Sequence, residues 1–273
     1  MIRDYSESKC LVRFFHILQR HFGPQNWWPT TPPGKKHPVY RKHPAHSGCP
    51  GTEKAKLEVC VGAILTQNTA WSNVEKALGR LHASGALRLE RLASFPLAQL
   101  AVRIRSSGYF RQKAKKLRFF ARYVLGKYGT VSRFLKSKPW PELRGELLDL
   151  YGVGPETADS ILLYAGGHPS FVVDAYTRRI VARWGILSPK KSENYDAVRD
   201  FFMQRLPSRS RLFNEHHALL VALGKYYCKK IPLCRDCPAR PICKRCLTPF
   251  KFIGIGIERA PASSRRRGPG PPE

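Results

Sequence analysis

Acidic residues are scarce in this 273-residue chain: 19 Asp and Glu face 48 Lys and Arg, which gives a formal net charge of +29. A charge of this size attracts polyanions, and it far exceeds the magnitude of about 2 to 8 that keeps a small domain soluble. We therefore expect a nucleic acid as the partner. An acidic membrane surface is the alternative, but the chain has no separate basic amphipathic helix to bind one.

Long apolar runs are also missing. No segment approaches the roughly 20 apolar residues that a membrane-spanning helix requires, and the charged first nine residues contain no signal-peptide core. These absences predict an intracellular protein without a membrane anchor, in the cytoplasm or nucleoid if its source is prokaryotic. Its eight cysteines should then stay reduced or bind metal instead of forming disulfides.

Alternating strand patterns and internal repeats are absent as well, and helical patterns take their place. Apolar residues recur at helical spacing over residues 11–22 and again, between short Gly/Pro turns, over residues 55–227. This pattern predicts an all-α fold. The segment 30–51, rich in Pro, Gly, His and Lys, is expected to be an exposed, mobile insertion, and the tail 247–273 to be largely disordered.

A glycine hairpin, Leu150-Tyr151-Gly152-Val153-Gly154, predicts a tight connection between two helices. Its glycines can adopt backbone angles that other residues avoid, and Pro155 suits the first turn of the following helix. The N–H groups and positive dipole at the start of that helix form an anion site. Gly152, Val153 and Gly154 are therefore candidates to hold a DNA phosphate without reading bases. An ordinary helix–helix connection is the alternative.

A lone acid, Asp174, follows twenty residues after Gly154, in Val172-Val173-Asp174-Ala175-Tyr176. An Asp at the start of a helix is usually an N-cap, which accepts hydrogen bonds from the first backbone N–H groups. A carboxylate held in this way also stays ionised, so capping and catalysis are compatible. The hairpin and the acid together suggest an enzyme that grips a nucleic acid backbone with one part and breaks a bond with the other.

Four cysteines lie close together near the end of the chain, with the spacing Cys-x5-Cys-x2-Cys-x5-Cys. So many thiols at short spacing in an intracellular protein indicate a metal centre. A structural zinc site usually uses two Cys-x2-Cys pairs, and these four thiols contain only one, so a 4Fe-4S cluster fits them better and zinc is the alternative. Cys246 is close enough in the sequence to compete as a ligand. The candidate ligands are Cys228, Cys234, Cys237 and Cys243.

Several segments in a fixed order make the chain resemble the helix-hairpin-helix (HhH-GPD) DNA glycosylases of the endonuclease III superfamily. They are Ile64-Leu65-Thr66-Gln67-Asn68-Thr69, Gly108-Tyr109-Phe110-Arg111-Gln112-Lys113-Ala114, residues 150–179 and the cysteine cluster. The resemblance implies two helical domains that flank a DNA-binding cleft, with the hairpin in one domain and a C-terminal 4Fe-4S loop in the other. It also implies double-stranded DNA with a damaged base as the partner, and we expect a monomer.

The resemblance divides the chain into four expected parts. Residues 1–66, with the insertion 30–51, and residues 172–246 together form the domain that carries the cluster. Residues 67–171 form the helical domain with the hairpin, and residues 247–273 form the tail.

The resemblance also gives Asp174 and Glu156 their expected roles. Asp174 would stabilise the positive charge that develops on the deoxyribose when its bond to the base breaks, and would take a proton from the attacking water. Bifunctional members carry a lysine two residues after the last hairpin glycine, where this chain has Glu156. A carboxylate cannot form an imine, so we expect a monofunctional glycosylase that leaves an abasic site. A plain first-turn Glu is the alternative for Glu156.

A flipped-out base leaves a gap in the duplex that side chains must fill. Gln67 aligns with the wedge glutamine of the family, and Tyr109 falls where the family places a second wedge residue. Tyr109 could instead belong to the core. The basic residues that follow Tyr109, interleaved with apolar ones, predict a helix with one buried side and one side facing phosphates.

The lesion is suggested by three segments that are similar to the 3-methyladenine DNA glycosylase III branch. They are Gln25-Asn26-Trp27-Trp28-Pro29, residues 64–71 and residues 154–159. In that branch the Trp-Pro pair, Trp28 and Pro29 here, would line the base pocket. An alkylated purine is cationic and stacks well on an indole, worth about 0.5–2 kcal/mol. Lys225 is a further candidate for the pocket. The alternatives are tryptophans that only cap a core, an endonuclease III-like enzyme for oxidised or mismatched bases with lyase activity, and a noncatalytic DNA-binding protein.

Overall fold

The computed structural model describes residues 2–40 and 49–243, and its regular elements are helices apart from one isolated antiparallel bridge between Thr30 and Val39. The expected all-α fold is confirmed. No helix in this described part is long and apolar enough to cross a bilayer. The helices are α1 (Ile2–Phe22), α2 (Glu53–Leu65), α3 (Trp71–Ala83), α4 (Leu89–Ser94), α5 (Leu97–Arg103), η1 (Arg105–Ser107), α6 (Phe110–Tyr128), α7 (Val131–Leu135), α8 (Trp140–Leu148), α9 (Pro155–Ser160), η2 (Ile161–Ala165), α10 (Ala175–Trp184), α11 (Pro189–Glu193), α12 (Tyr195–Arg205), α13 (Ser210–Tyr226) and η3 (Arg240–Ile242).

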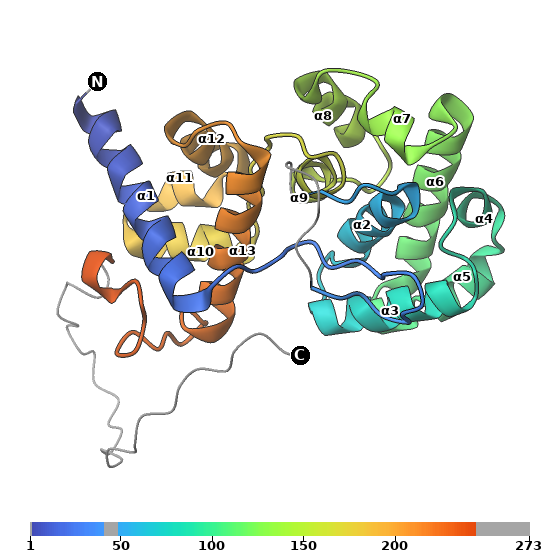
Figure 1. The fold of residues 1–273 in the computed structure, drawn as a ribbon, viewed down its shortest axis with the longest axis horizontal. Coiled ribbons are helices and arrows are strands. Elements are labelled where there is room, and N and C mark those ends of the chain that lie inside the picture. Colours follow the sequence, from blue (N-terminus) through green and yellow to red (C-terminus); the bar gives the residue numbers. More distant parts are fainter. Residues whose placement is uncertain (1, 41–48, 244–273) are drawn as a thin grey trace, which may run out of the picture.

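The helices gather in two lobes (Figure 1). One lobe holds α2 to α9 with η2, and the other holds α1 together with α10 to α13, so the first helix of the chain packs against α12 and α13. The expected division of the chain into domains stays a prediction; in the structure α1 lies with α12 and α13, whereas α2 packs on α3, α6, α7, α9 and η2. The hairpin lobe therefore begins near residue 53.

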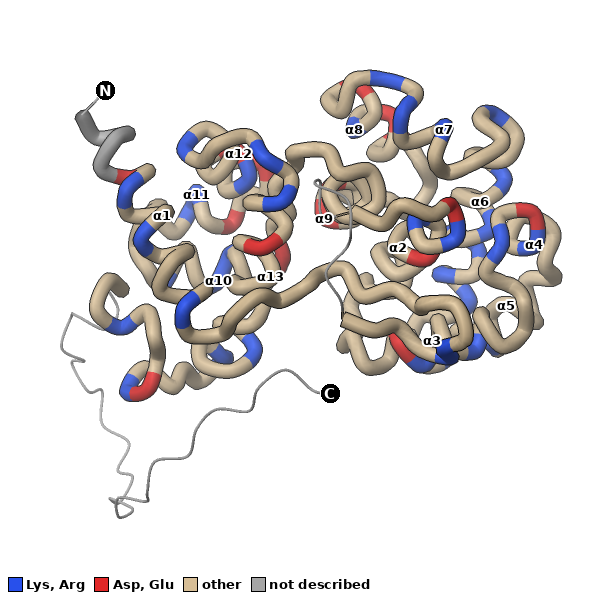
Figure 2. Tube along the Cα trace, viewed as in Figure 1, with Lys and Arg blue, Asp and Glu red and all other residues tan. Residues whose placement is uncertain are grey.

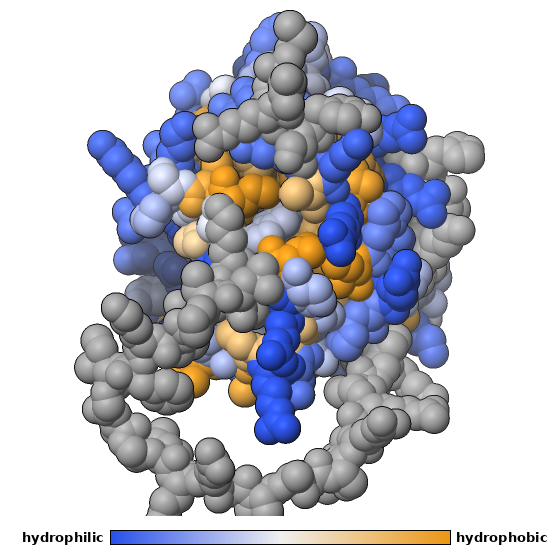
Figure 3. All heavy atoms as spheres, turned by 90° about the vertical axis from the view of Figure 1, so that its left-hand side faces the viewer, coloured by the Kyte–Doolittle hydropathy of each residue, from blue (hydrophilic) through white to orange (hydrophobic). Residues whose placement is uncertain are grey.

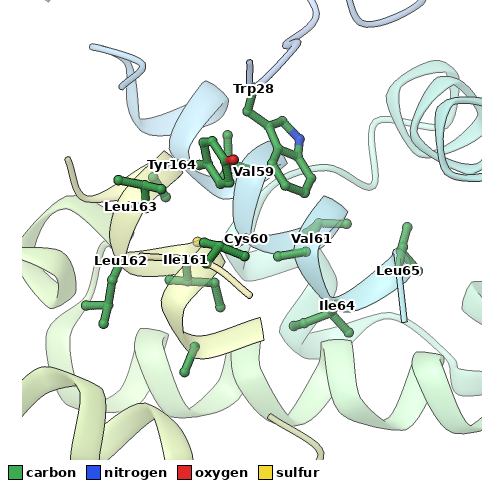
Figure 4. Close-up of a cluster of buried hydrophobic side chains, with 14 of the residues drawn as sticks. Trp28, Val59, Cys60, Val61, Ile64, Leu65, Ile161, Leu162, Leu163 and Tyr164 are labelled. Carbon is green, nitrogen blue, oxygen red and sulfur yellow. The ribbon is translucent and has the colours of Figure 1, made fainter. Parts of the chain in front are cut away.

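The centre of the hairpin lobe is α2, whose residues 57–65 are all buried. Apolar residues occupy nearly every position of this stretch, so the helix has no polar stripe and is covered on all sides. Figure 4 shows Cys60 of α2 beside Ile161 of η2, and Val59 of α2 beside Tyr164 of η2. Burying an aliphatic side chain contributes about 1.5–3 kcal/mol. Since η2 continues α9, this contact holds the second helix of the hairpin in place.

The segment 30–51 is better packed than its composition suggests. Thr30 is fully buried, and Val39 N–H donates to its carbonyl at 3.0 Å. Thr31 donates through its N–H (2.9 Å) and its hydroxyl (2.6 Å) to the fully buried carboxylate of Glu58. Thr30 and Thr31 are therefore buried, because a buried acid in α2 needs such donors, whereas residues 33–37 are exposed as expected. The mobility of the insertion stays a prediction. Residues 41–48 and the tail 247–273 lie outside the described residues.

Lys and Arg residues are spread over both lobes (Figure 2). Figure 3 views the α1 side of the molecule, where apolar and basic side chains are mixed. On this lobe a groove of about 660 Å³ runs between α1 and the cysteine segment, with Val12, Ile17 and Pro241 among its lining residues. It contains no residue of the hairpin or of the Asp174 segment, so the candidate site lies elsewhere.

Candidate active site and DNA interface

The glycine hairpin connects α8 to α9. Gly152 has φ +78°, in the left-handed region that glycine tolerates best, and Val153 N–H donates to the Leu150 carbonyl at 3.0 Å. A Cβ atom on Gly152 would lie 2.5 Å from side-chain carbons of Lys116, so α6 approaches the hairpin closely. No side chain caps the first turn of α9. Its N–H groups are thus oriented as an anion site requires, and phosphate binding by Gly152, Val153 and Gly154 stays a prediction.

Gln67 lies against this hairpin. Its Nε2 donates to the Gly152 carbonyl and to Thr157 Oγ1, both at 2.9 Å, and its Oε1 accepts from Lys116 Nζ at 2.6 Å. Both ends of the amide are therefore held by the protein. The next residue, Asn68, is exposed and has φ +54°, which marks the tip of the turn. The structure thus places Gln67 between the turn and the hairpin, and its role as a wedge stays a prediction.

Tyr109 is 67% exposed and precedes α6 with φ +43°, so it is not part of the core. The buried Lys113 links the turn before Tyr109 to the turn that carries Gln67. Its Nζ donates to the Leu65 carbonyl (2.8 Å) and to the Ser107 carbonyl (2.5 Å). Burial, and to a lesser extent the charge of Lys116, lowers the pKa of Lys113 to about 8. Sequence reasoning placed Lys113 on the phosphate-facing side, whereas the structure uses it as an internal brace.

Asp174 caps α10: its Oδ1 accepts the Thr177 N–H at 2.7 Å. The side chain is 15% exposed, so the carboxylate is shielded but not sealed in the interior. His217 Nε2, from α13, lies 3.9 Å from Asp174 Oδ2. The expected cap is therefore present, and the geometry leaves the second oxygen of the carboxylate available for chemistry.

Glu156, in the first turn of α9, lies within electrostatic reach of Asp174. Glu156 is exposed at the surface, although other protein atoms lie close to its carboxyl group. Loss of solvation, and then the charge of Asp174, raise the pKa of Glu156 to about 7, while Arg178 opposes the shift. The two carboxyl groups thus differ in environment, and that of Glu156 can stay protonated near neutral pH.

Trp28 and Pro29 are both buried, and Trp28 packs on Tyr164 and Trp71 with ring centroids 5.2 and 5.1 Å away. Trp27 is partly buried and meets Trp71 at 5.2 Å. An aromatic cluster is therefore present at this place, with Trp28 on its inner side. Sequence reasoning gave no role to Trp71 or Tyr164, although Trp71 closes the segment that contains Gln67.

Lys225 is exposed, and its Nζ lies 5.2 Å from the centroid of the Tyr226 ring. Within the described part of the chain, we find no contact that joins it to Asp174 or to the tryptophans. Sequence reasoning also missed His217, whose only signal was a His-His pair in an apolar helix.

The four candidate cysteine ligands are partly buried around one another. Burial, and then the charges of the other three thiolates, raise the pKa of Cys237 to about 11. Arg183 on α10 donates to Cys228 Sγ at 3.4 Å. By number and softness the thiols fit an iron–sulfur or zinc group. Within residues 2–40 and 49–243, however, no three His, Cys, Asp or Glu side chains are arranged as ligands of one ion.

Sequence comparison relates the chain to DNA repair enzymes. Residues 61–208 match the HhH-GPD superfamily of base excision DNA repair proteins. The chain is 37% identical over 239 residues to a putative DNA repair glycosylase of Methanocaldococcus jannaschii, covering 87% of this chain and 97% of that protein. It is 28% identical over 200 residues to endonuclease III of Bacillus subtilis, covering 73% and 85%.

Solved structures agree with this relationship. The crystal structure of H. pylori 3-methyladenine DNA glycosylase bound to 1,N6-ethenoadenine matches with a TM-score of 0.62 and 25% identity, over 80% of this chain and 97% of that one. A trapped endonuclease III–DNA covalent intermediate matches with a TM-score of 0.61 and 25% identity, over 70% and 84%. The chain therefore belongs to the HhH-GPD superfamily of base excision DNA repair proteins, as a DNA glycosylase related to endonuclease III.

Proposed function

We propose that the chain is a monofunctional glycosylase that flips a damaged base out of double-stranded DNA and hydrolyses its N-glycosidic bond. The observation that carries this proposal is the pairing of a capped, partly exposed Asp174 with Glu156 at the start of α9. The ionised Asp174 stabilises the developing sugar cation and accepts a proton from water. The hairpin holds a neighbouring phosphate, while Gln67 and Tyr109 occupy the gap in the stack.

Hydrolysis by water is favoured over strand cleavage, because Glu156 stands where bifunctional members have lysine. Two lysines of α6 are already engaged in the free protein: Lys116 holds Gln67, and Lys113 is buried between two carbonyl groups. We therefore expect an abasic product and no Schiff-base intermediate.

Alkylated purines such as 3-methyladenine are the proposed substrate class. The aromatic cluster of Trp27, Trp28 and Trp71 supports this assignment, since a cationic base stacks favourably on indole rings. A cationic base is also a good leaving group and needs little acid catalysis. The likeness to the H. pylori 3-methyladenine glycosylase supports it too. Oxidised bases are the second candidate for the substrate, because the chain is also similar to endonuclease III.

A 4Fe-4S cluster is the proposed cofactor, held by the Cys228, Cys234, Cys237 and Cys243 thiolates, with zinc as the alternative. Its role would be structural, because it would stiffen a loop that carries basic residues. Three α10 side chains already hold this segment: Arg179 donates to the Cys228 carbonyl, Arg183 to the Lys229 and Lys230 carbonyls, and Trp184 to that of Ile242.

The test is a panel of duplex oligonucleotides, each with one lesion, incubated with the protein and analysed with and without alkali. We expect strand breaks at alkylated purines only after alkali, and loss of base release with retained DNA binding in Asp174→Asn. Borohydride trapping of a covalent adduct would overturn the monofunctional assignment. Unchanged base release by Asp174→Asn would overturn the catalytic one. Size-exclusion chromatography with light scattering tests the expected monomer.

A further inference from the structure

The histidine pair on α13 brings a buried imidazole to the catalytic acid. His217 is buried, and its Nδ1 lies 2.5 Å from the hydroxyl oxygen of Tyr164. Its other nitrogen, Nε2, has no hydrogen-bond partner within the described residues and lies 3.9 Å from Asp174 Oδ2. Tyr164, His217 and Asp174 therefore form a continuous row from the aromatic cluster to the carboxylate.

The direction of the hydrogen bonds follows from the charge states. Burial, and then the charge of Asp174, hold the pKa of Tyr164 well above its usual value, so its hydroxyl keeps a proton to donate. Burial lowers the pKa of His217, with Asp174 opposing, so the imidazole is neutral. If Tyr164 donates to Nδ1, then Nε2 carries the proton and points it at the carboxylate. The opposite tautomer would aim a nitrogen lone pair at Oδ2. This arrangement is unfavourable because both atoms carry negative partial charge.

The position of Tyr164 depends on an irregular helix. It belongs to η2, a π-helix in which the Gly166 N–H donates to the Ile161 carbonyl at 3.1 Å. The wider turn costs regular α-helical hydrogen bonds, and such turns occur frequently at functional sites. Trp28 packs on the Tyr164 ring. Tyr164 therefore contacts both the proposed base pocket and the His217 imidazole.

We propose that His217 is a positioning residue for Asp174, a role that rests on the proposed catalytic function of that acid. Hydrogen bonds that are long in a free enzyme shorten in the substrate complex. When DNA is bound, Nε2–H would reach Oδ2 while Thr177 N–H holds Oδ1, so both oxygens are oriented. The other titratable groups around the row are Glu156 from α9, Arg178 from α10, and Glu215 and His216 from α13.

The test is single-turnover base release as a function of pH. His217→Leu removes the donor, so ionised Asp174 loses a stabilising partner. We expect a rate about 10- to 100-fold lower at neutral pH. We also expect the acid limb of the profile to move to higher pH by about one unit. His217→Gln keeps an N–H donor of similar reach and should restore most of the rate. Tyr164→Phe removes the hydroxyl that fixes the His217 tautomer, and it should move the acid limb by a smaller amount in the same direction.

His216→Leu is the matched control, because the same substitution one residue earlier removes a buried imidazole that packs on Phe15 and Phe171 instead of facing Asp174. The acid limb of its pH profile should keep the wild-type midpoint. Binding to a duplex with an uncleavable abasic-site analogue checks folding and affinity. A wild-type pH profile in both His217→Leu and Tyr164→Phe overturns the inference, and Tyr164→Phe alone decides if His217→Leu does not fold. Full base release by Asp174→Asn would instead remove the proposed function itself.

Discussion

Gln67 and Gly152 are 85 positions apart in the sequence, yet the Gln67 amide donates a 2.9 Å hydrogen bond to the Gly152 carbonyl. The residue expected to enter the duplex is thus held by the loop expected to bind phosphate. Lys116 completes the arrangement through the Gln67 oxygen. A phosphate at the hairpin would compete for the Lys116 ammonium group, and this competition would help Gln67 to leave.

Gln67→Ala should lower base release from duplex DNA by about 10- to 100-fold, because both the gap-filling group and its hairpin contacts are lost. The loss should be smaller when the lesion lies opposite a mismatch, since less energy is needed to open that pair. Single-turnover assays on matched and mismatched duplexes measure the difference. Gln99→Ala on α5, an exposed amide outside the site, is the control. Equal losses on both duplexes would contradict the wedge role.

Gly152→Ala should destabilise the fold and weaken DNA binding. A left-handed backbone costs an alanine about 1–2 kcal/mol, and the added Cβ would overlap the Lys116 side chain. Gly126→Ala, in the last turn of α6 with open space around it, should instead stabilise by up to about 0.5–1 kcal/mol, the cost of a glycine inside a helix. Urea unfolding of the two variants measures the opposite signs. A neutral Gly152→Ala would show that the hairpin tolerates a side chain.

Glu156→Gln should make the protein more stable than the wild type at pH 8, with little difference near pH 4. The folded state holds the pKa of Glu156 near 7, above its ordinary value of 4.5, so it disfavours the ionised form. The protonated group contributes fully below pH 4.5, and this contribution is lost as the pH rises through 7. Thermal melts at both pH values measure the change. The control Glu142→Gln removes an exposed carboxylate of α8 far from Asp174 in sequence. A difference in stability between Glu156→Gln and the wild type that is the same at both pH values would contradict the raised pKa of Glu156.

Cys237→Ser should remove the brown colour and most of the iron that we expect in the purified protein. Iron, sulfide and zinc analysis distinguishes the two candidate metals. Cys10→Ser replaces an exposed thiol of α1 and should leave the metal content unchanged. Zinc in the wild-type protein would identify the alternative site, and a metal-free wild type that still binds DNA would remove the cofactor proposal.

The sequence predicted the parts of this protein that depend on neighbouring residues. Gly152, Pro155 and Asp174 each carry a local backbone preference, so the hairpin and the cap of α10 could be read directly. The contacts that sequence reasoning missed join distant segments. Thr31 meets Glu58, and Tyr164 meets His217, only because helices pack in three dimensions. No periodicity predicts which buried acid or histidine will find which partner.

The brace formed by Lys113 has a consequence for how the protein inspects DNA. The Lys113 ammonium group donates to the carbonyls of both Leu65 and Ser107, so it connects the turns that carry Gln67 and Tyr109. Neither turn can shift without straining the other. The backbone positions of Gln67 and Tyr109 would therefore keep their spacing when the Gln67 side chain leaves the hairpin, and both residues would enter the duplex from one common rigid base.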